Sequence, residues 1–164
     1  MSQSFASRQW QLHDDAHTRA AGGVLARELS AVSKDKPLLI TLQGELGAGK
    51  TTFVSGLLQG LGHVGRVPSP TYTLVESYDL SDRIVAHLDL YRLTDPQQLE
   101  DLGWRDLLQP GAIVLVEWPE RAGALLSAPD LSVRLSYGRD GVGRQLELVS
   151  GSETFRQLID RINF

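Results

Sequence analysis

The segment from Gly44 to Thr51 has the residue types and the spacing of a phosphate-binding loop. It matches the pattern Gly-x-x-x-x-Gly-Lys-Ser/Thr at every position. Its glycines let backbone N–H groups surround a phosphate, Lys50 is expected to reach the β- and γ-phosphates, and the Thr51 hydroxyl to bind Mg²⁺. The residues expected to contact the nucleotide are Glu45, Gly47, Ala48, Gly49, Lys50, Thr51 and Thr52. The loop predicts that the chain binds a nucleoside triphosphate.

Two carboxylates could complete this site, because Mg²⁺ needs an oxygen ligand besides the Thr51 hydroxyl. Asp89 ends one apolar segment and Glu117 ends another. In α/β sheets ligands bind at the carboxyl ends of the strands, so both side chains are expected beside the loop. One would serve the metal, and the other would orient the attacking water or sense the γ-phosphate. With Lys50, they are the candidate catalytic residues.

A stiff segment at residues 67–73, here called the proline loop, is a third candidate feature. Pro68 and Pro70 exclude both a helix and regular strand pairing there. Its hydroxyl side chains could report on the γ-phosphate. Alternatively, Ser and Thr could satisfy their own backbone in a purely structural turn. The residues leave both interpretations open.

Alternating helical and strand patterns must position these residues. Helices are expected from Asp14 or Asp15 through Leu29 (with Ala20, Ala21, Val24, Leu25 and Leu29 on one side), over 52–61, from Pro96 through Leu102, and over 154–162. Strands are expected at 8–12, 37–42, 71–78, 83–89, 112–117, 131–137 and 145–149. We therefore expect an α/β fold, a P-loop NTPase-like three-layer sandwich with a mainly parallel sheet and an added antiparallel strand pair.

Composition limits the possible classes of protein. The length of 164 residues predicts one domain over 1–164, and the absence of cysteine excludes disulfides and thiolate catalysis. A net charge of −4 argues against a large nucleic-acid footprint on this chain alone. Residues 1–6 lack the signature of a signal peptide, and no apolar run is long enough to span a bilayer. We expect a cytoplasmic location and no membrane partner.

Four segments in order resemble a known family. They are the loop at 44–52, Ser-Pro-Thr-Tyr-Thr-Leu-Val at 69–75, His-Leu-Asp-Leu-Tyr-Arg-Leu at 87–93 and Val-Glu-Trp-Pro-Glu at 116–120. The set resembles the bacterial TsaE (YjeE) ATPases over nearly the whole chain. This resemblance implies an Mg²⁺-dependent ATPase that supports the TsaB–TsaD complex in threonylcarbamoyl modification of the adenosine beside the tRNA anticodon. It implies that tRNA is reached only indirectly, through that complex.

The resemblance also implies roles for particular residues. By position, Thr51 and Glu117 would bind Mg²⁺, and Asp89 would be needed for hydrolysis. Thr18 would lie near the nucleotide base, and Arg144 near the nucleotide. The alternatives are a threonine on a helix surface and an arginine at a strand edge.

Two further side chains are open to two interpretations. Trp118 could pack near the γ-phosphate or at a partner surface, but a tryptophan after a core strand is more often part of the core. His87 shares a strand face with Asp89, and a structural role is favoured for it.

Other nucleotide-dependent functions remain alternatives. A P-loop small-molecule kinase would need an acceptor site and mobile arginines, for which the candidates are Arg92, Arg105 and Arg121. A GTPase is disfavoured because its guanine-reading Asn-Lys-x-Asp element is missing, and Asn163 is the chain's single asparagine. A nucleotide-dependent interaction module is the non-enzymatic alternative.

Overall fold

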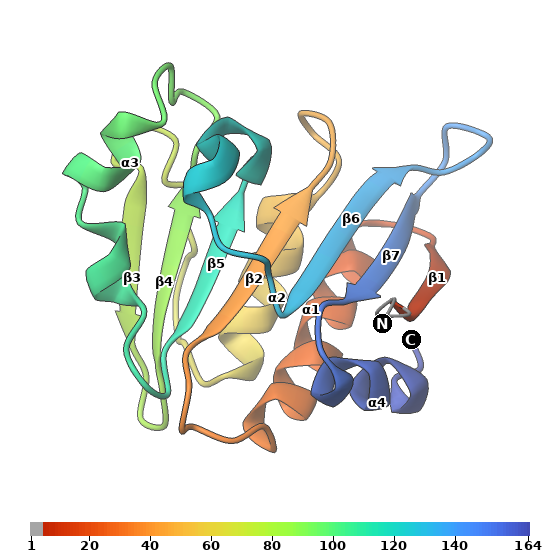
Figure 1. Ribbon diagram of the computed structural model, residues 1–164. Coiled ribbons are helices and arrows are strands. Elements are labelled where there is room, and N and C mark those ends of the chain that lie inside the picture. Colours follow the sequence, from red (N-terminus) through yellow and green to blue (C-terminus); the bar gives the residue numbers. More distant parts are fainter. Residues whose placement is uncertain (1–4) are drawn as a thin grey trace.

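The computed structural model describes residues 5–164, which form one seven-stranded sheet with helices packed on it (Figure 1). Residues 1–4, part of the segment in which no signal peptide is expected, lie outside the described residues. The strands are β1 (Ser7–Leu12), β2 (Leu38–Gln43), β3 (Val75–Asp79), β4 (Ile84–Asp89), β5 (Ile113–Glu117), β6 (Leu131–Tyr137) and β7 (Arg144–Ser150). The helices are α1 (Asp15–Ser30), α2 (Lys50–Gly60), α3 (Gln97–Asp101) and α4 (Glu153–Arg161), with 3-10 helices η1 (Trp104–Leu107) and η2 (Pro119–Leu125).

The strand order is β1-β7-β6-β2-β5-β4-β3. The pairs β2–β5, β2–β6 and β4–β5 are parallel, whereas β3–β4, β6–β7 and β1–β7 are antiparallel. The late strand pair is antiparallel as expected, but its first strand, β6, also extends the parallel part of the sheet. The prediction of one added antiparallel pair on a mainly parallel sheet was wrong, because β3 and β1 also pair antiparallel at the two edges and make the sheet mixed. The carboxyl ends of the parallel strands β2, β4 and β5 meet at one edge, where α/β proteins bind ligands.

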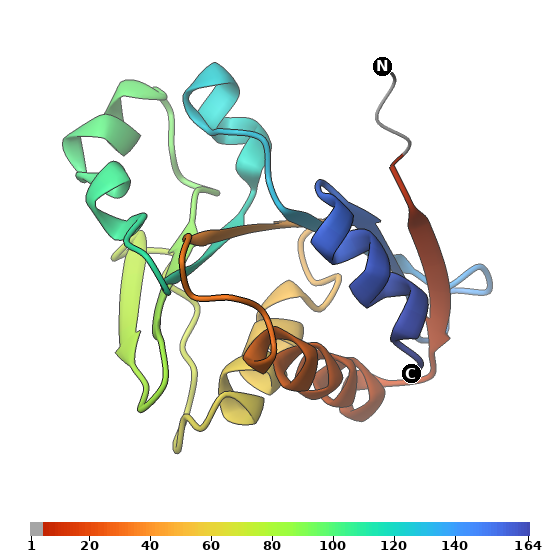
Figure 2. The same cartoon turned by 60° about the horizontal axis from the view of Figure 1, so that its bottom comes forward.

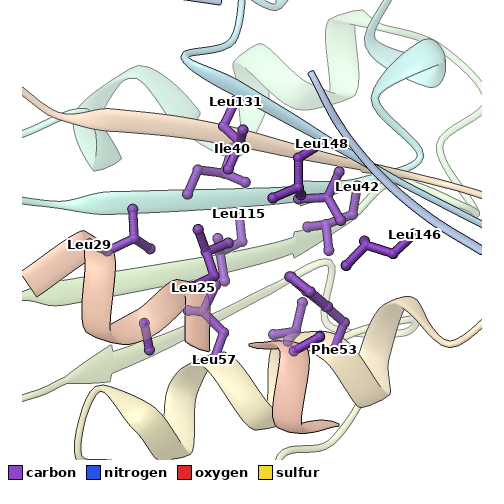
Figure 3. Close-up of a cluster of buried hydrophobic side chains, with 14 of the residues drawn as sticks. Leu25, Leu29, Ile40, Leu42, Phe53, Leu57, Leu115, Leu131, Leu146 and Leu148 are labelled. Atoms are coloured by element: carbon purple, nitrogen blue, oxygen red, sulfur yellow. The ribbon is translucent and has the colours of Figure 1, made fainter. Parts of the chain in front are cut away.

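One face of the sheet carries the main core. Buried side chains of α1, α2 and α4 pack there against β2, β4 to β7 and the end of β1. Figure 3 shows the centre of this core, where Leu25 of α1 and Leu57 of α2 approach Leu115 of β5. The two helices touch so closely that a Cβ atom at Gly22 would lie 2.1 Å from the carbonyl oxygen of Phe53. This contact fixes α2, which begins at the phosphate-binding loop.

The opposite face is only partly covered. Leu88 of β4 and Val114 of β5 pack there against Leu99 of α3 and Trp104 of η1. Figure 2 shows these short helical segments standing over one end of the sheet, away from α1 and α2. On this face β6, β7 and β1 present mainly polar side chains, among them Arg134, which is exposed. The third layer of the expected sandwich is therefore incomplete, because polar residues need no cover.

Most of the expected elements are found within a few residues of their predicted ends, with two differences. The strand predicted at 71–78 begins only at Val75, because Thr71 to Thr73 form a turn and Leu74 has a φ of 65°. Ala20, expected on the buried side of its helix, is exposed. Asp14, not Asp15, caps α1 by accepting a hydrogen bond from the backbone of His17. Within residues 5–164, no helix has both the length and the apolar character needed to cross a membrane.

Candidate functional site

The phosphate-binding loop joins the end of β2 to the start of α2, and its backbone requires glycine. Gly49, which directly precedes α2, has a φ of 103°, in the left-handed region where a side chain is strained. At Gly44, a Cβ atom would lie 2.3 Å from the carbonyl oxygen of Leu135 on β6. The loop can therefore pass close to β6 and present the N-terminus of α2, with its free N–H groups, to a cleft.

Arg144 of β7 contacts this loop from the side. Its Nε and Nη2 atoms donate hydrogen bonds to the carbonyl oxygens of Ala48 and Gly47, at 3.0 and 3.2 Å. Its guanidinium carbon also lies 4.7 Å from the ring centre of Tyr137, whose hydroxyl donates to the Leu46 carbonyl at 3.1 Å. The Tyr137 hydroxyl and the Arg144 guanidinium thus hold the outer side of the loop.

The two residues expected to bind Mg²⁺ are brought together. Thr51, in the first turn of α2, donates through Oγ1 to Oε1 of Glu117 at 3.2 Å. Glu117 is buried at the end of β5, opposite Leu42 of β2. A hydroxyl beside a carboxylate fits Mg²⁺, which prefers oxygen ligands and commonly retains water and substrate phosphates as the others. Within the described residues, no group of three or more His, Cys, Asp or Glu side chains could hold a metal ion.

His87 of β4 contacts the same carboxylate oxygen. Its Nε2 lies 2.9 Å from Oε1 of Glu117, and both side chains are buried. The sequence favoured a structural histidine and did not predict this contact. Alternation along β4 was the available signal, since it places His87 and Asp89 on one face of the sheet.

Asp89 ends β4 directly opposite Glu117 in the parallel register. Its Oδ2 accepts hydrogen bonds from the hydroxyls of Ser69 and Thr71, at 3.1 and 3.4 Å. Its Oδ1 accepts one from the backbone N–H of Tyr91 at 2.9 Å. Two hydroxyls of the proline loop are therefore bonded to a candidate catalytic carboxylate.

Lys50 lies folded over the loop. Its Nζ donates to the carbonyl oxygens of Gly44 and Glu45 and lies 4.0 Å from the ring centre of Trp118. Burial lowers the pKa of the Lys50 ammonium, an effect opposed by the negative charges of Glu117 and of Asp89 and Glu120. Trp118 is half-buried; it lines the cleft and also packs against the apolar cluster on the opposite face of the sheet, which contains Leu99 and Trp104.

These groups surround a cleft of about 460 Å³, within the range of small-molecule sites. Its lining includes most residues singled out in the sequence: Gly47, Ala48, Gly49, Lys50, Thr51, Thr52, Asp89, Glu117 and Arg144. It also includes residues that the sequence did not single out as contacts, chiefly Asp15 at the start of α1 and Tyr91 after β4. The sequence indicates Asp15 only as a candidate start of a helix, and Tyr91 lies in the segment 87–93 that resembles the family but is given no contact of its own by that resemblance.

Two of the predicted contact residues do not line the cleft. Glu45 has an exposed side chain, and its carbonyl oxygen is the atom that faces Lys50. Thr18 is fully buried behind the loop, and its hydroxyl donates to the Asp14 carbonyl of its own helix at 3.2 Å. Its methyl carbon would lie 3.4 Å from a Cβ atom at Gly49, so Thr18 packs against the loop. The cleft therefore presents neither side chain to a ligand in this arrangement.

Of the three arginines considered as candidates for a kinase, one lines the cleft and two do not. Arg92 lines the cleft, with its guanidinium carbon 4.4 Å from the ring centre of the exposed Tyr72. Arg105 is paired with Glu100 at 2.7 Å, and Arg121 lies 5.9 Å from the ring centre of Tyr91. Neither of the latter two lines the cleft.

The fold and the cleft define an α/β protein in which a glycine loop and two strand-end carboxylates meet at the carboxyl edge of one sheet. The sequence profile of the family described as "Threonylcarbamoyl adenosine biosynthesis protein TsaE" matches residues 12–146. The chain belongs to the TsaE family.

Individual relatives agree with this assignment. A protein of Haemophilus influenzae named tRNA threonylcarbamoyladenosine biosynthesis protein TsaE is 41% identical over 138 residues, which cover 84% of this chain and 86% of that protein. A protein of the same name from Nostoc is 38% identical over 152 residues, covering 90% and 89%. The crystal structure of Bacillus subtilis YdiB shares the fold, with a TM-score of 0.77, 23% identity, and coverage of 97% of this chain and 95% of that one.

Proposed function

We propose that the chain is an Mg²⁺-dependent ATPase that binds ATP in the cleft and supports a TsaB–TsaD complex in threonylcarbamoyladenosine modification of tRNA. The observation that supports this most directly is the meeting of Thr51, Glu117 and Asp89 at the edge of the sheet, beside the phosphate-binding loop. The relatives' names refer to tRNA threonylcarbamoyladenosine biosynthesis and support a role in that modification.

In this proposal the N–H groups of the loop and Lys50 bind the phosphates, and Thr51 and Glu117 hold Mg²⁺. The bound ion would neutralise charge that develops on the phosphate oxygens. Asp89 would orient the attacking water, because its carboxylate lines the cleft and is held by Ser69 and Thr71. The two hydroxyls can reorganise with the γ-phosphate, which gives the proline loop a means to report the nucleotide state.

ATP in place of GTP is proposed because the guanine-reading Asn-Lys-x-Asp element is missing from the sequence. A location in the cytoplasm follows from the proposed work on tRNA. The partner complex, and not this chain, would contact the tRNA, since the chain carries a net charge of −4.

The test is ATP hydrolysis by the chain alone, with TsaB and TsaD, and with TsaB, TsaD and tRNA. We expect Mg²⁺-dependent phosphate release that rises when the partners are added. Binding of ATP without hydrolysis under all three conditions would instead support a nucleotide-dependent interaction module. Phosphate transfer that requires a small-molecule acceptor would support the alternative P-loop kinase.

A further inference from the structure

His87 is a buried polar residue for which packing gives no reason. Its side chain is completely buried on the face of the sheet where Val85, Ile113 and Leu115 are all apolar. Its Nδ1 atom has no hydrogen-bond partner among the described residues. An apolar residue would pack here without leaving a buried nitrogen unpaired, so the histidine must be explained by its other nitrogen.

That other nitrogen is directed at Glu117. Nε2 lies 2.9 Å from Oε1, and a carboxylate oxygen can only accept, so the proton of this hydrogen bond belongs to His87. The same oxygen also accepts from the Thr51 hydroxyl at 3.2 Å. Two donors from different elements, β4 and α2, therefore hold one oxygen of a candidate metal ligand.

We infer that His87 is a positioning residue that fixes the Glu117 carboxylate for Mg²⁺ and makes the site selective for this ion. The inference rests on the proposed function and adds to it a residue that does not itself touch the nucleotide, since His87 does not line the cleft. A carboxylate held by two donors at Oε1 has little freedom to rotate, and its orientation toward the cleft is set before any ligand arrives.

Selectivity follows from the coordination that each ion requires. Mg²⁺ is small and demands nearly ideal octahedral geometry, whereas Ca²⁺ accepts longer distances and irregular arrangements. Loss of the His87 hydrogen bond leaves the charge of Glu117 in place but lets the carboxylate turn. Binding of Mg²⁺ should suffer from this freedom far more than binding of Ca²⁺.

The experiment measures how tightly Mg²⁺ and Ca²⁺ each support binding of a nonhydrolysable ATP analogue, by calorimetry, together with thermal unfolding of every variant. His87→Leu removes the donor and keeps an apolar side chain of similar size. His87→Gln retains an N–H donor at a similar reach. His63→Leu is the matched control, because His63 lies outside the cleft and packs on Tyr78.

We expect His87→Leu to lower the Mg²⁺ affinity about 10- to 100-fold, the range seen when a hydrogen-bond partner of a metal ligand is lost. Its Ca²⁺ affinity should change much less, and His87→Gln and the control should resemble the parent protein. An unchanged Mg²⁺ affinity in His87→Leu, or equal losses for both ions, would overturn the inference.

If His87→Leu does not fold, His87→Asn provides the comparison with His87→Gln, because the shorter amide does not reach Glu117. A preference for Mg²⁺ over Ca²⁺ that is kept in His87→Gln and lost in His87→Asn supports the inference. Identical ion preferences of the two variants contradict it. If the parent protein itself binds no nucleotide with Mg²⁺, the proposed function fails, and this is seen before any variant is compared.

Discussion

Thr51 and Glu117 are separated by 66 residues in the sequence, yet the hydroxyl of one donates to the carboxylate of the other at 3.2 Å. The contact exists because β2 and β5 are neighbours in the sheet and the loop after β2 leads directly into α2. It joins the phosphate-binding loop to the strand-end carboxylates in one cleft.

Replacing each carboxylate by its amide should separate two roles. We expect Glu117→Gln to weaken Mg²⁺-dependent ATP binding, because a metal ligand loses its charge. Asp89→Asn should leave binding nearly intact and lower the hydrolysis rate by about 10²- to 10⁴-fold, as for loss of a group that positions or accepts a proton. Calorimetry and phosphate release under single-turnover conditions measure the two effects. Parent-like hydrolysis by both variants, with the partners present, would show that the site is assigned wrongly.

Nucleotide binding should take up a proton at alkaline pH. Burial lowers the pKa of Lys50 from its ordinary value of 10.5, so part of the free protein carries a neutral Lys50 below that pH. Phosphates favour the ammonium form and raise this pKa on binding, hence ATP affinity should fall as the pH rises above the lowered pKa of Lys50 in the free protein. Calorimetry in buffers of different ionisation enthalpy measures the uptake. Lys50→Arg, which remains charged throughout, should abolish it, and uptake that persists in this variant would assign the proton to another group.

Removing the Arg144 side chain should loosen the phosphate-binding loop. Arg144→Ala loses the hydrogen bonds to Gly47 and Ala48, each worth about 0.5–1.5 kcal/mol, so ATP binding should weaken by roughly tenfold. Arg134→Ala is the control, since Arg134 bonds to Gln43 and Glu147 outside the cleft. Equal ATP affinity in the two variants would contradict a role for Arg144 in shaping the loop.

The contact between α1 and α2 should make two adjacent glycines respond oppositely to alanine. At Gly22 a Cβ atom would lie 2.1 Å from the backbone of α2, so Gly22→Ala should lower the free energy of unfolding by about 1–3 kcal/mol or more. At Gly23 the nearest such atom is 3.8 Å away, and Gly23→Ala should stabilise the helix by about 0.5–1 kcal/mol. Thermal unfolding measures both, and similar midpoints for the two variants would show that the helices do not approach this closely.

Local patterns were sufficient for most strands and α-helices of this fold, but they did not predict the 3-10 helices η1 and η2. Prolines, glycines and apolar runs located the strands and helices, because these signals act within a few residues. The prediction was wrong where tertiary context decided: the strand at 71–78 starts at Val75, after the turn that brings the proline loop to Asp89. The incomplete third layer was also not predicted, since strand order determines which polar faces lie together.

The sequence by itself determined the phosphate-binding loop and the carboxylates at two strand ends, because both depend on residue types at short spacing. The tertiary structure alone decided that Thr51 and His87 share one oxygen of Glu117, and that Arg92, not Arg105 or Arg121, lines the cleft. The physical reason is that these contacts join segments far apart in the chain. Their geometry is set by the register of β4 on β5 and by the packing of α2 on the sheet, neither of which a local pattern encodes.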